Sequence, residues 1–204
     1  MTKENEEKKS GPVYALILAG GQSRRLGEKK ERLVILQKPV LATLVKTLEP
    51  LCEKVFLSLR INQKVPPFYR GEQIRDISRN GGPLVGILSA MRIHPEADWL
   101  VVACDQILLK GSELKKIVEA GLEHKLGACF HSPKGLEPLG AFYRAGLLPL
   151  LKSQYQKRNF ALHRLVEKAG AGFGRVRTRK PLFNLNTPED LKKASRILGR
   201  LSRK

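Results

Sequence analysis

Residues 13–30 read VYALILAGGQSRRLGEKK, an apolar run that stops at two glycines and is followed by a cluster of cationic side chains. The apolar run over 12–19 predicts a strand that is buried on both faces. Because glycine has no Cβ atom, Gly20 and Gly21 let the backbone turn tightly and approach a ligand closely. Backbone N–H groups in such a turn form a concavity that suits an anion. We therefore expect a ligand-binding loop directly after this strand.

The loop also carries side chains whose groups bind phosphate oxygens, namely Ser23, Arg24, Arg25 and Lys30. A guanidinium group fits a phosphate bidentately, and an ammonium group adds a point charge. The loop is not a Walker A loop, because no Gly-Lys-Ser/Thr follows Gly27, and it lacks the G-x-G-x-x-G dinucleotide fingerprint. The alternative interpretation is an ordinary strand-to-helix turn with solvated arginines.

Strand and helix patterns alternate along the rest of the chain. Apolar runs predict further strands at 54–60, 72–78 and 97–105. Helical spacing predicts helices at 39–51, 81–94 and 112–123, the last with a serine cap. Beyond these, we expect strands near 125–130 and 137–144, helices near 145–155 and 159–169, and an edge strand at 172–178. A short strand from 182 leads into a helix to 201, with Thr187 as its N-cap and Pro188 at its first position.

This order predicts one α/β domain with three layers (α/β/α), in which helices cover both faces of a mostly parallel, Rossmann-like sheet. We assign the domain to 12–204 and expect the charged segment 1–11 to be a disordered tail. In such sheets ligands bind beyond the carboxyl ends of the strands. The loop after residue 18, the glycines at 81–82 and Asp105 should therefore share one crevice.

Two aspartates are candidates for the chemistry of that crevice. Asp105 follows a strongly apolar strand, and Mg²⁺ is often held by one or two carboxylates together with substrate phosphates. The alternative for Asp105 is a turn or helix-cap role. Asp76 either accepts hydrogen bonds from a ribose or base, or caps its own loop. The four histidines show no metal-ligand spacing, and neither a G-x-S-x-G nor an H-E-x-x-H motif occurs.

The charge balance narrows the class of ligand. Thirty-eight Lys and Arg residues against 19 Asp and Glu residues give a net charge of +19, which favours nucleic acid, an anionic membrane or polyphosphorylated small molecules. No set of aromatic residues for base stacking accompanies the basic residues, which argues against nucleic acid. No apolar run approaches the ~18 residues that cross a bilayer, so we expect no membrane partner. Three scattered cysteines and an N-terminus without an apolar signal sequence predict a cytoplasmic location. We interpret Cys104 as a small buried residue rather than a nucleophile.

LAGGQSRRLG (18–27), followed by Lys30, resembles the signature Leu-x-Gly-Gly-x-Ser-x-Arg-Met/Leu-Gly-x-Asp-Lys of nucleotidyltransferases. More narrowly, the chain is similar to the molybdenum cofactor guanylyltransferases (MobA-type nucleotidyltransferases). Further stretches match this family in the same order: Lys38-Pro39, Asp76 with Gly82-Pro83-Leu84-x-Gly86-Ile87, Ala103-Cys104-Asp105, EPLGAFYR (137–144) and FNLNTPEDL (183–191). The resemblance covers about residues 13 to 198, which is nearly the whole chain.

The resemblance implies a sheet of the nucleotide-diphospho-sugar transferase type and a Mg²⁺-dependent reaction. GMP would pass from GTP to the phosphate of the molybdenum-bearing molybdopterin, with release of pyrophosphate. The residues expected to bind the substrates or the metal are Leu18, Ala19, Gly20, Gly21, Ser23, Arg24, Lys30, Asp76, Gly82, Asp105 and Asn186. Catalytic roles fall to Arg25, Lys30 and Asp105, and Asp105 is the expected metal ligand.

The chain departs from the family pattern at two places. Lys29 stands where the family usually has an aspartate before the signature lysine, which removes an acid that could orient Lys30. Gln106-Ile107-Leu108 replaces the usual Met/Thr-Pro-Phe, and we expect this to change the shape of the loop rather than metal binding. The basic C-terminal helix is either a docking surface for other molybdenum cofactor proteins or a solvated face.

Three alternatives to a guanylyltransferase stay open at the level of sequence. The first is a nucleotidyltransferase of the same fold that uses CTP, or that acts on a sugar phosphate. The second is a catalytically weakened member that binds nucleotide or pterin without turning it over. The third is a nucleic-acid-binding protein, an interpretation that only the net charge supports.

Overall fold

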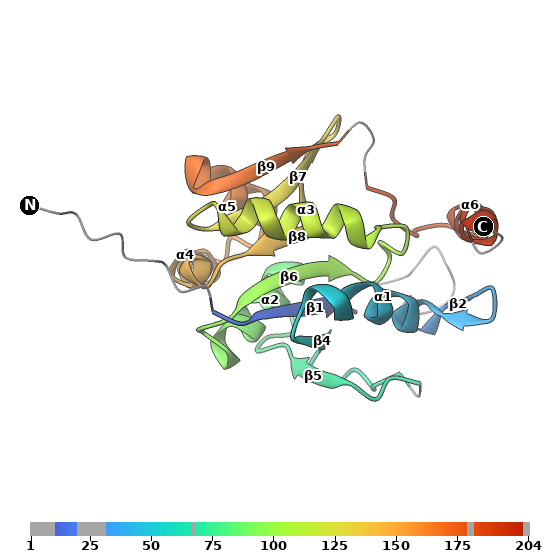
Figure 1. Cartoon of the computed structure of the whole chain (residues 1–204). Coiled ribbons are helices and arrows are strands. Elements are labelled where there is room, and N and C mark those ends of the chain that lie inside the picture. The colour runs from blue at the N-terminus through green and yellow to red at the C-terminus, as the bar shows by residue number, and fades with distance from the viewer. Residues whose placement is uncertain (1–10, 20–31, 67, 179–181, 202–204) are drawn as a thin grey trace, which may run out of the picture.

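A seven-stranded sheet in the order β5-β4-β1-β6-β8-β7-β9 runs through the computed structural model, which describes residues 11–19, 32–66, 68–178 and 182–201 (Figure 1). Its strands are β1 (Val13–Leu18), β4 (Lys54–Leu59), β5 (Glu72–Arg75), β6 (Asp98–Ala103), β7 (Gly127–Ser132), β8 (Gly135–Tyr143) and β9 (Phe173–Arg177). β1 pairs in parallel with β4 and β6, β4 with β5, and β7 with β9. β8 runs antiparallel to β6 and β7. The prediction of a mostly parallel sheet is confirmed, and β9 is the expected edge strand.

Helices cover both faces of the sheet, which confirms the three layers (Figure 1). α1 (Val40–Leu48) and α3 (Gly111–Leu122) pack on one face, in a core that includes Ala15 and Ile17 of β1. α2 (Gly82–Ile93), α4 (Leu148–Gln156) and α5 (Leu162–Ala169) pack on the other, in a core that includes Leu16 and Leu18. Since successive strand residues point to opposite faces, β1 must be apolar throughout to fill both cores.

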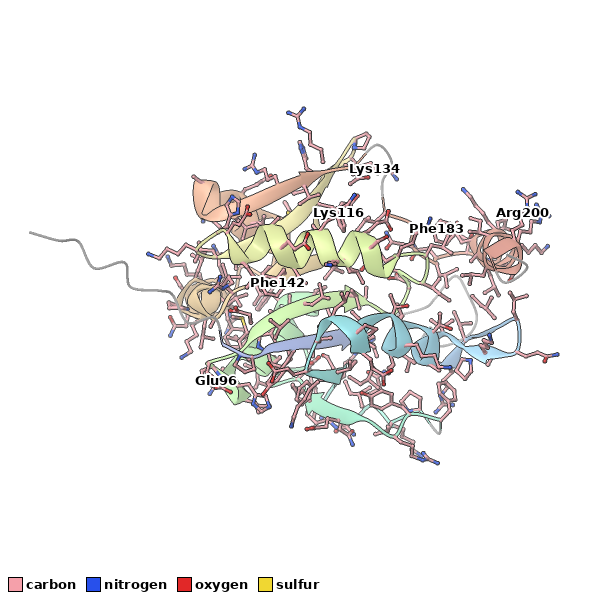
Figure 2. The ribbon with its side chains drawn as sticks, in the orientation of Figure 1. Glu96, Lys116, Lys134, Phe142, Phe183 and Arg200 are labelled. Atoms are coloured by element: carbon pink, nitrogen blue, oxygen red, sulfur yellow. The ribbon has the colours of Figure 1, made fainter. Side chains whose placement is uncertain are left out.

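α6 (Pro188–Leu201) lies beyond the end of the sheet towards which β1 and β6 point (Figure 1). Figure 2 shows Phe183 and Arg200 at this end and Glu96 at the opposite end. The predicted cap of α6 is confirmed, because the Thr187 hydroxyl accepts a hydrogen bond from the Asp190 N–H at 3.2 Å. The Asp190 carboxylate in turn accepts from the Thr187 N–H at 3.0 Å, which closes a reciprocal cap.

Four local predictions are wrong. The strand expected at 72–78 ends at Arg75. The helix expected at 39–51 begins at Val40, because Pro39 belongs to β3 (Lys38–Pro39), which pairs with β2 (Val34–Ile35). That helix ends at Leu48 and continues only as a 3₁₀ turn, η2 (Glu49–Leu51). The N-cap of α3 is Lys110 and not the expected serine. Lys110 has an extended backbone, and its N–H donates to the Glu113 carboxylate at 3.0 Å. Residues 182–186 form no strand, since this segment crosses the sheet end.

The remaining short elements are two 3₁₀ turns, η3 (Ala145–Leu147) and η4 (Gly170–Gly172), which flank the pair α4 and α5. Apart from Gly11, the tail expected at 1–11 lies outside the described residues. Across the described segments, no helix has both the length and the apolar character that a bilayer crossing requires.

Candidate functional site

A cavity of about 590 Å³ opens at the carboxyl ends of β1, β4 and β6. This volume lies in the range of roughly 300–1,000 Å³ that is typical of small-molecule sites. Residues that line it include Leu18, Ser58, Arg60, Asp76, Gly81, Gly82, Gly86, Ala103, Asp105, Leu139, Asn184 and Asn186. The end of β1, the glycines at 81–82 and Asp105 therefore share one crevice. This confirms the prediction for the two glycines and Asp105, whereas residues 20–31 of the predicted loop lie outside the described residues.

Asp76 and Ser58 form a hydrogen-bonded pair in the wall of this cavity. The Ser58 hydroxyl donates to Oδ1 of Asp76 at 3.0 Å, and the Asp76 N–H donates to the carbonyl of Leu59 at 2.9 Å. Burial raises the pKa of the Asp76 carboxyl, while the Ser58 hydroxyl and the Arg60 charge partly oppose this shift. The pair therefore presents a fixed acceptor to a ligand that offers hydroxyl or N–H groups.

The turn before α2 requires glycine at two successive positions. Gly81 and Gly82 have φ angles of +130° and +57°, which side chains other than glycine rarely adopt. Ser89 of α2 links the helix to the segment before this turn. Its hydroxyl accepts a hydrogen bond from the Ile77 N–H at 3.0 Å and donates one to the Val85 carbonyl at 2.7 Å. The first residues of α2 consequently reach the cavity with their backbone close to any ligand.

Asp105 lies two residues beyond β6 and is half-buried. Its carbonyl accepts a hydrogen bond from the Leu185 N–H at 3.0 Å, and the Leu185 side chain is fully buried. Because neighbours in the chain flank this anchor, Asn184 and Asn186 both line the cavity. The cavity lining thus includes one carboxylate residue and two residues with side-chain amides on the side formed by the Asp105 turn. Cys104 is only 3% exposed, which agrees with a packing role.

The predicted role of Ala19 fits the geometry less directly. Its N–H donates to the Ser58 carbonyl at 3.1 Å, and its carbonyl accepts from Nε2 of Gln63 at 3.0 Å. Ala19 is 1% exposed, whereas Leu18 lines the cavity. The backbone of Ala19 therefore holds the start of the loop against β4. The other predicted residues of the loop lie outside the described residues: Gly20, Gly21, Ser23, Arg24, Arg25, Lys29 and Lys30.

Sequence reasoning missed several residues that line the cavity, namely Ser58, Arg60, Arg79, Asn80 and Asn184. Ser58 carried a usable signal, since it is the polar residue within the otherwise apolar stretch 55–59 of β4. Asn184 is the first asparagine of the Asn-x-Asn motif, of which only Asn186 was predicted. Arg60, Arg79 and Asn80 follow strands or precede helices, where sequence alone gives no preference.

Comparison with known proteins shows to which family the chain is similar. The sequence model of the MobA-like NTP transferase domain family matches residues 15–172. A protein from Thermococcus kodakarensis named probable molybdenum cofactor guanylyltransferase is 30% identical over 202 residues, covering 92% of this chain and 96% of that protein. The molybdenum cofactor biosynthesis bifunctional protein of Synechocystis sp. is 29% identical over 186 residues, which are 88% of this chain. The match covers 52% of that protein, so the chain corresponds to about half its length.

A solved structure supports the fold independently of sequence identity. Molybdopterin-guanine dinucleotide biosynthesis protein A from Archaeoglobus fulgidus superposes with a TM-score of 0.78 at 22% identity. The match covers 92% of this chain and 99% of that one. The two chains therefore share one fold over nearly their whole lengths.

Proposed function

The chain belongs to the MobA-like NTP transferase domain family, and on this premise we propose that it transfers GMP from GTP to the phosphate of molybdopterin. The products would be molybdopterin guanine dinucleotide and pyrophosphate. One observation carries the proposal: Leu18, Asp76, Gly82, Asp105 and Asn186, which belong to motifs spread along the whole chain, line a single cavity. GTP and molybdopterin are the proposed small-molecule substrates, and the cytoplasmic location stays a prediction.

In this proposal the nucleoside lies on the side of the cavity formed by Asp76 and α2. The Asp76 carboxylate, oriented by Ser58 at 3.0 Å, accepts hydrogen bonds from the nucleoside. Gly82 leaves room for it beside the backbone, because a Cβ atom at this position would meet nothing within 4 Å. Arg25 and Lys30 are assigned to the triphosphate, where their charges would stabilise the departing pyrophosphate.

The opposite wall suits a hard divalent cation. Its candidate ligands are the Asp105 carboxylate and the amide oxygens of Asn184 and Asn186, and oxygen ligands are those that Mg²⁺ prefers. Among the residues that the structure describes, no three His, Cys, Asp or Glu side chains gather into a metal site. Substrate phosphates would therefore complete the coordination, as they commonly do for Mg²⁺. When bound there, the cation supplies charge stabilisation at the α-phosphate.

The transfer itself needs little from the protein beyond position and charge. An oxygen of the pterin phosphate attacks the α-phosphorus of GTP in line, and the bond from this phosphorus to the bridging oxygen of the β-phosphate breaks. The leaving pyrophosphate takes the electron pair. No general base is required, because the attacking phosphate is already ionised near neutral pH. The chain contributes by holding both substrates in one cavity in the reactive orientation.

Pyrophosphate release with molybdopterin and each of the four nucleoside triphosphates tests the proposal. We expect turnover with GTP, and a loss of at least about 100-fold in Asp105→Ala, since metal contributes several kcal/mol. Glu119→Ala is the matched control, because this exposed carboxylate of α3 lies outside the cavity lining and is ion-paired with Lys115 at 3.9 Å. Equal turnover with CTP would refute the choice of guanine. Unchanged turnover in Asp105→Ala would refute the catalytic assignment.

A further inference from the structure

The pairing between β6 and β8 stops before the strands reach the cavity. The ladder joins Trp99 to Tyr143, Leu100 to Phe142 and Val101 to Ala141. The same register, continued by two residues on each strand, would place Ala103 opposite Leu139. These two residues both line the cavity instead.

The side chain of Gln106 occupies the position between them. Its Oε1 accepts a hydrogen bond from the Ala103 N–H at 2.9 Å, and its Nε2 donates to the Leu139 carbonyl at 3.1 Å. A primary amide offers one acceptor and one donor, as a peptide group does. The Gln106 amide therefore replaces the bond that the two backbones would otherwise make with each other.

The consequence is a fixed separation of the two strands at the cavity. Gln106 is 2% exposed, so water does not compete for its hydrogen bonds. Its own N–H donates to the Ala103 carbonyl at 3.0 Å, which closes the turn that contains Asp105. On the β8 side, Gly140 has a φ of +76°, and a Cβ atom there would lie 3.0 Å from Leu182. The backbone of β8 therefore passes close to Leu182 and to the Gln106 amide at this position.

We propose that Gln106 is a positioning residue that holds the Asp105 turn and the Leu139 wall at the distance the reaction needs. The proposal rests on the function proposed above, since it assigns Asp105 to the metal and the space beside it to the phosphate groups. Gln106 itself touches neither substrate. Its amide acts through the backbones of Ala103 and Leu139, which carry the two walls.

The test compares two buried glutamines. Gln106→Leu removes both hydrogen bonds at similar volume. Gln154→Leu makes the same change of side chain at a glutamine that is 4% exposed and whose Oε1 has no hydrogen-bond partner within the described residues. This glutamine belongs to α4, which lies at the other end of the sheet (Figure 1). Mn²⁺ binding is measured by electron paramagnetic resonance in the presence of GTP, GTP binding by equilibrium dialysis, and folding by thermal denaturation.

We expect Gln106→Leu to weaken Mn²⁺ binding by about 10- to 100-fold, as changes that misalign metal ligands do. The affinity for GTP without metal should change less than about threefold, because Asp76 and α2 are untouched. Gln154→Leu should bind Mn²⁺ as the unchanged protein does. Equal Mn²⁺ binding by both variants would overturn the inference. Failure of the unchanged protein to bind GTP would instead overturn the proposed function.

If Gln106→Leu does not fold, Gln106→Glu gives the same test. A carboxylate keeps the volume and still accepts from the Ala103 N–H, but it cannot donate to the Leu139 carbonyl. Mn²⁺ binding within twofold of the unchanged protein would then contradict the positioning role.

Discussion

Gly86 of α2 lines the cavity, and its replacement by alanine tests how tightly the cavity lining is packed around this glycine. A Cβ atom at this position would lie 2.7 Å from Oγ of Ser58 and 2.8 Å from Cδ2 of Leu18. It would also lie 3.5 Å from Oδ1 of Asp76. The added methyl group therefore meets the hydrogen bond that orients the Asp76 carboxylate.

Two opposing effects set the magnitude. Alanine is favoured over glycine inside a helix by about 0.8–1.0 kcal/mol, whereas overpacking a core costs about 1–3 kcal/mol. We expect Gly86→Ala to lower the free energy of unfolding by about 0–2 kcal/mol. Gly199→Ala is the control, because a Cβ atom there lies 3.8 Å from Cδ1 of Leu36, which is ordinary contact. This control should gain about 0.5–1 kcal/mol.

Thermal denaturation followed by circular dichroism measures the difference between the two variants. A difference of about 0.5–3 kcal/mol corresponds to roughly 1–12 °C in Tm for a chain of this size. GTP affinity should fall in Gly86→Ala and stay unchanged in Gly199→Ala, since only the former displaces Ser58 and Asp76. A Gly86→Ala protein that melts at or above the unchanged protein, with unaltered GTP affinity, would refute the packing argument.

Three further outcomes follow from the buried and capping carboxylates. Burial raises the pKa of Asp76 above its ordinary 3.8, so GTP affinity should fall as the pH drops through this raised pKa. The Ser58 hydroxyl opposes the shift, so Ser58→Ala should move the loss of affinity to higher pH in a binding titration. Arg144→Ala leaves Asp98 buried without its 2.9 Å ion-pair partner, which should cost about 3–5 kcal/mol in urea denaturation, while Arg144→Lys costs less. The hydrogen bonds of the cap lower the pKa of Asp190 in the folded protein. The stabilisation that its carboxylate gives the folded state is therefore complete above the pKa of Asp190 in the unfolded chain, about 3.8. It is lost as the pH falls through the lower pKa of the folded state. Asp190→Asn should flatten that acid limb, and an unaltered limb would contradict the cap.

The strands were predictable where burial alone determines the sequence. β1 and β6 lie between other strands and under helices on both faces, so nearly every residue must be apolar, and their bounds agree with the expectation to within two residues. The β2–β3 hairpin was missed because its strands are two residues long. Its turn residues Leu36 and Gln37 have φ angles of 50° and 62°, a conformation that asparagine or glycine usually signals.

The site was predictable to the extent that it follows strand ends. Asp76, Gly82 and Asp105 could be placed together because parallel strands deliver their carboxyl ends to one edge. The sequence marks Ser58 as a polar residue in a buried strand. Its bond to Asp76 could not be deduced, because a serine at such a position is as consistent with a bond to its own backbone. The bridging role of Gln106 depends on the register between β6 and β8, which are separated by more than thirty residues in the chain.

The two walls of the cavity are held by different contacts, which has a consequence for how substitutions combine. On the nucleoside side, Gly86 would contact Leu18, Ser58 and Asp76. On the metal side, Gln106 bonds to Ala103 and Leu139. Within the described part of the chain these two sets have no member in common, and they meet where Leu18 pairs with Ala103 in the ladder between β1 and β6. Effects at sites without shared partners usually add to within about 0.3–0.5 kcal/mol. The stability losses of Gly86→Ala and Gln106→Leu should therefore add in the double variant. A coupling above about 1 kcal/mol would mean that the walls move as one unit, and the assignment of separate roles to Asp76 and Asp105 would have to be abandoned.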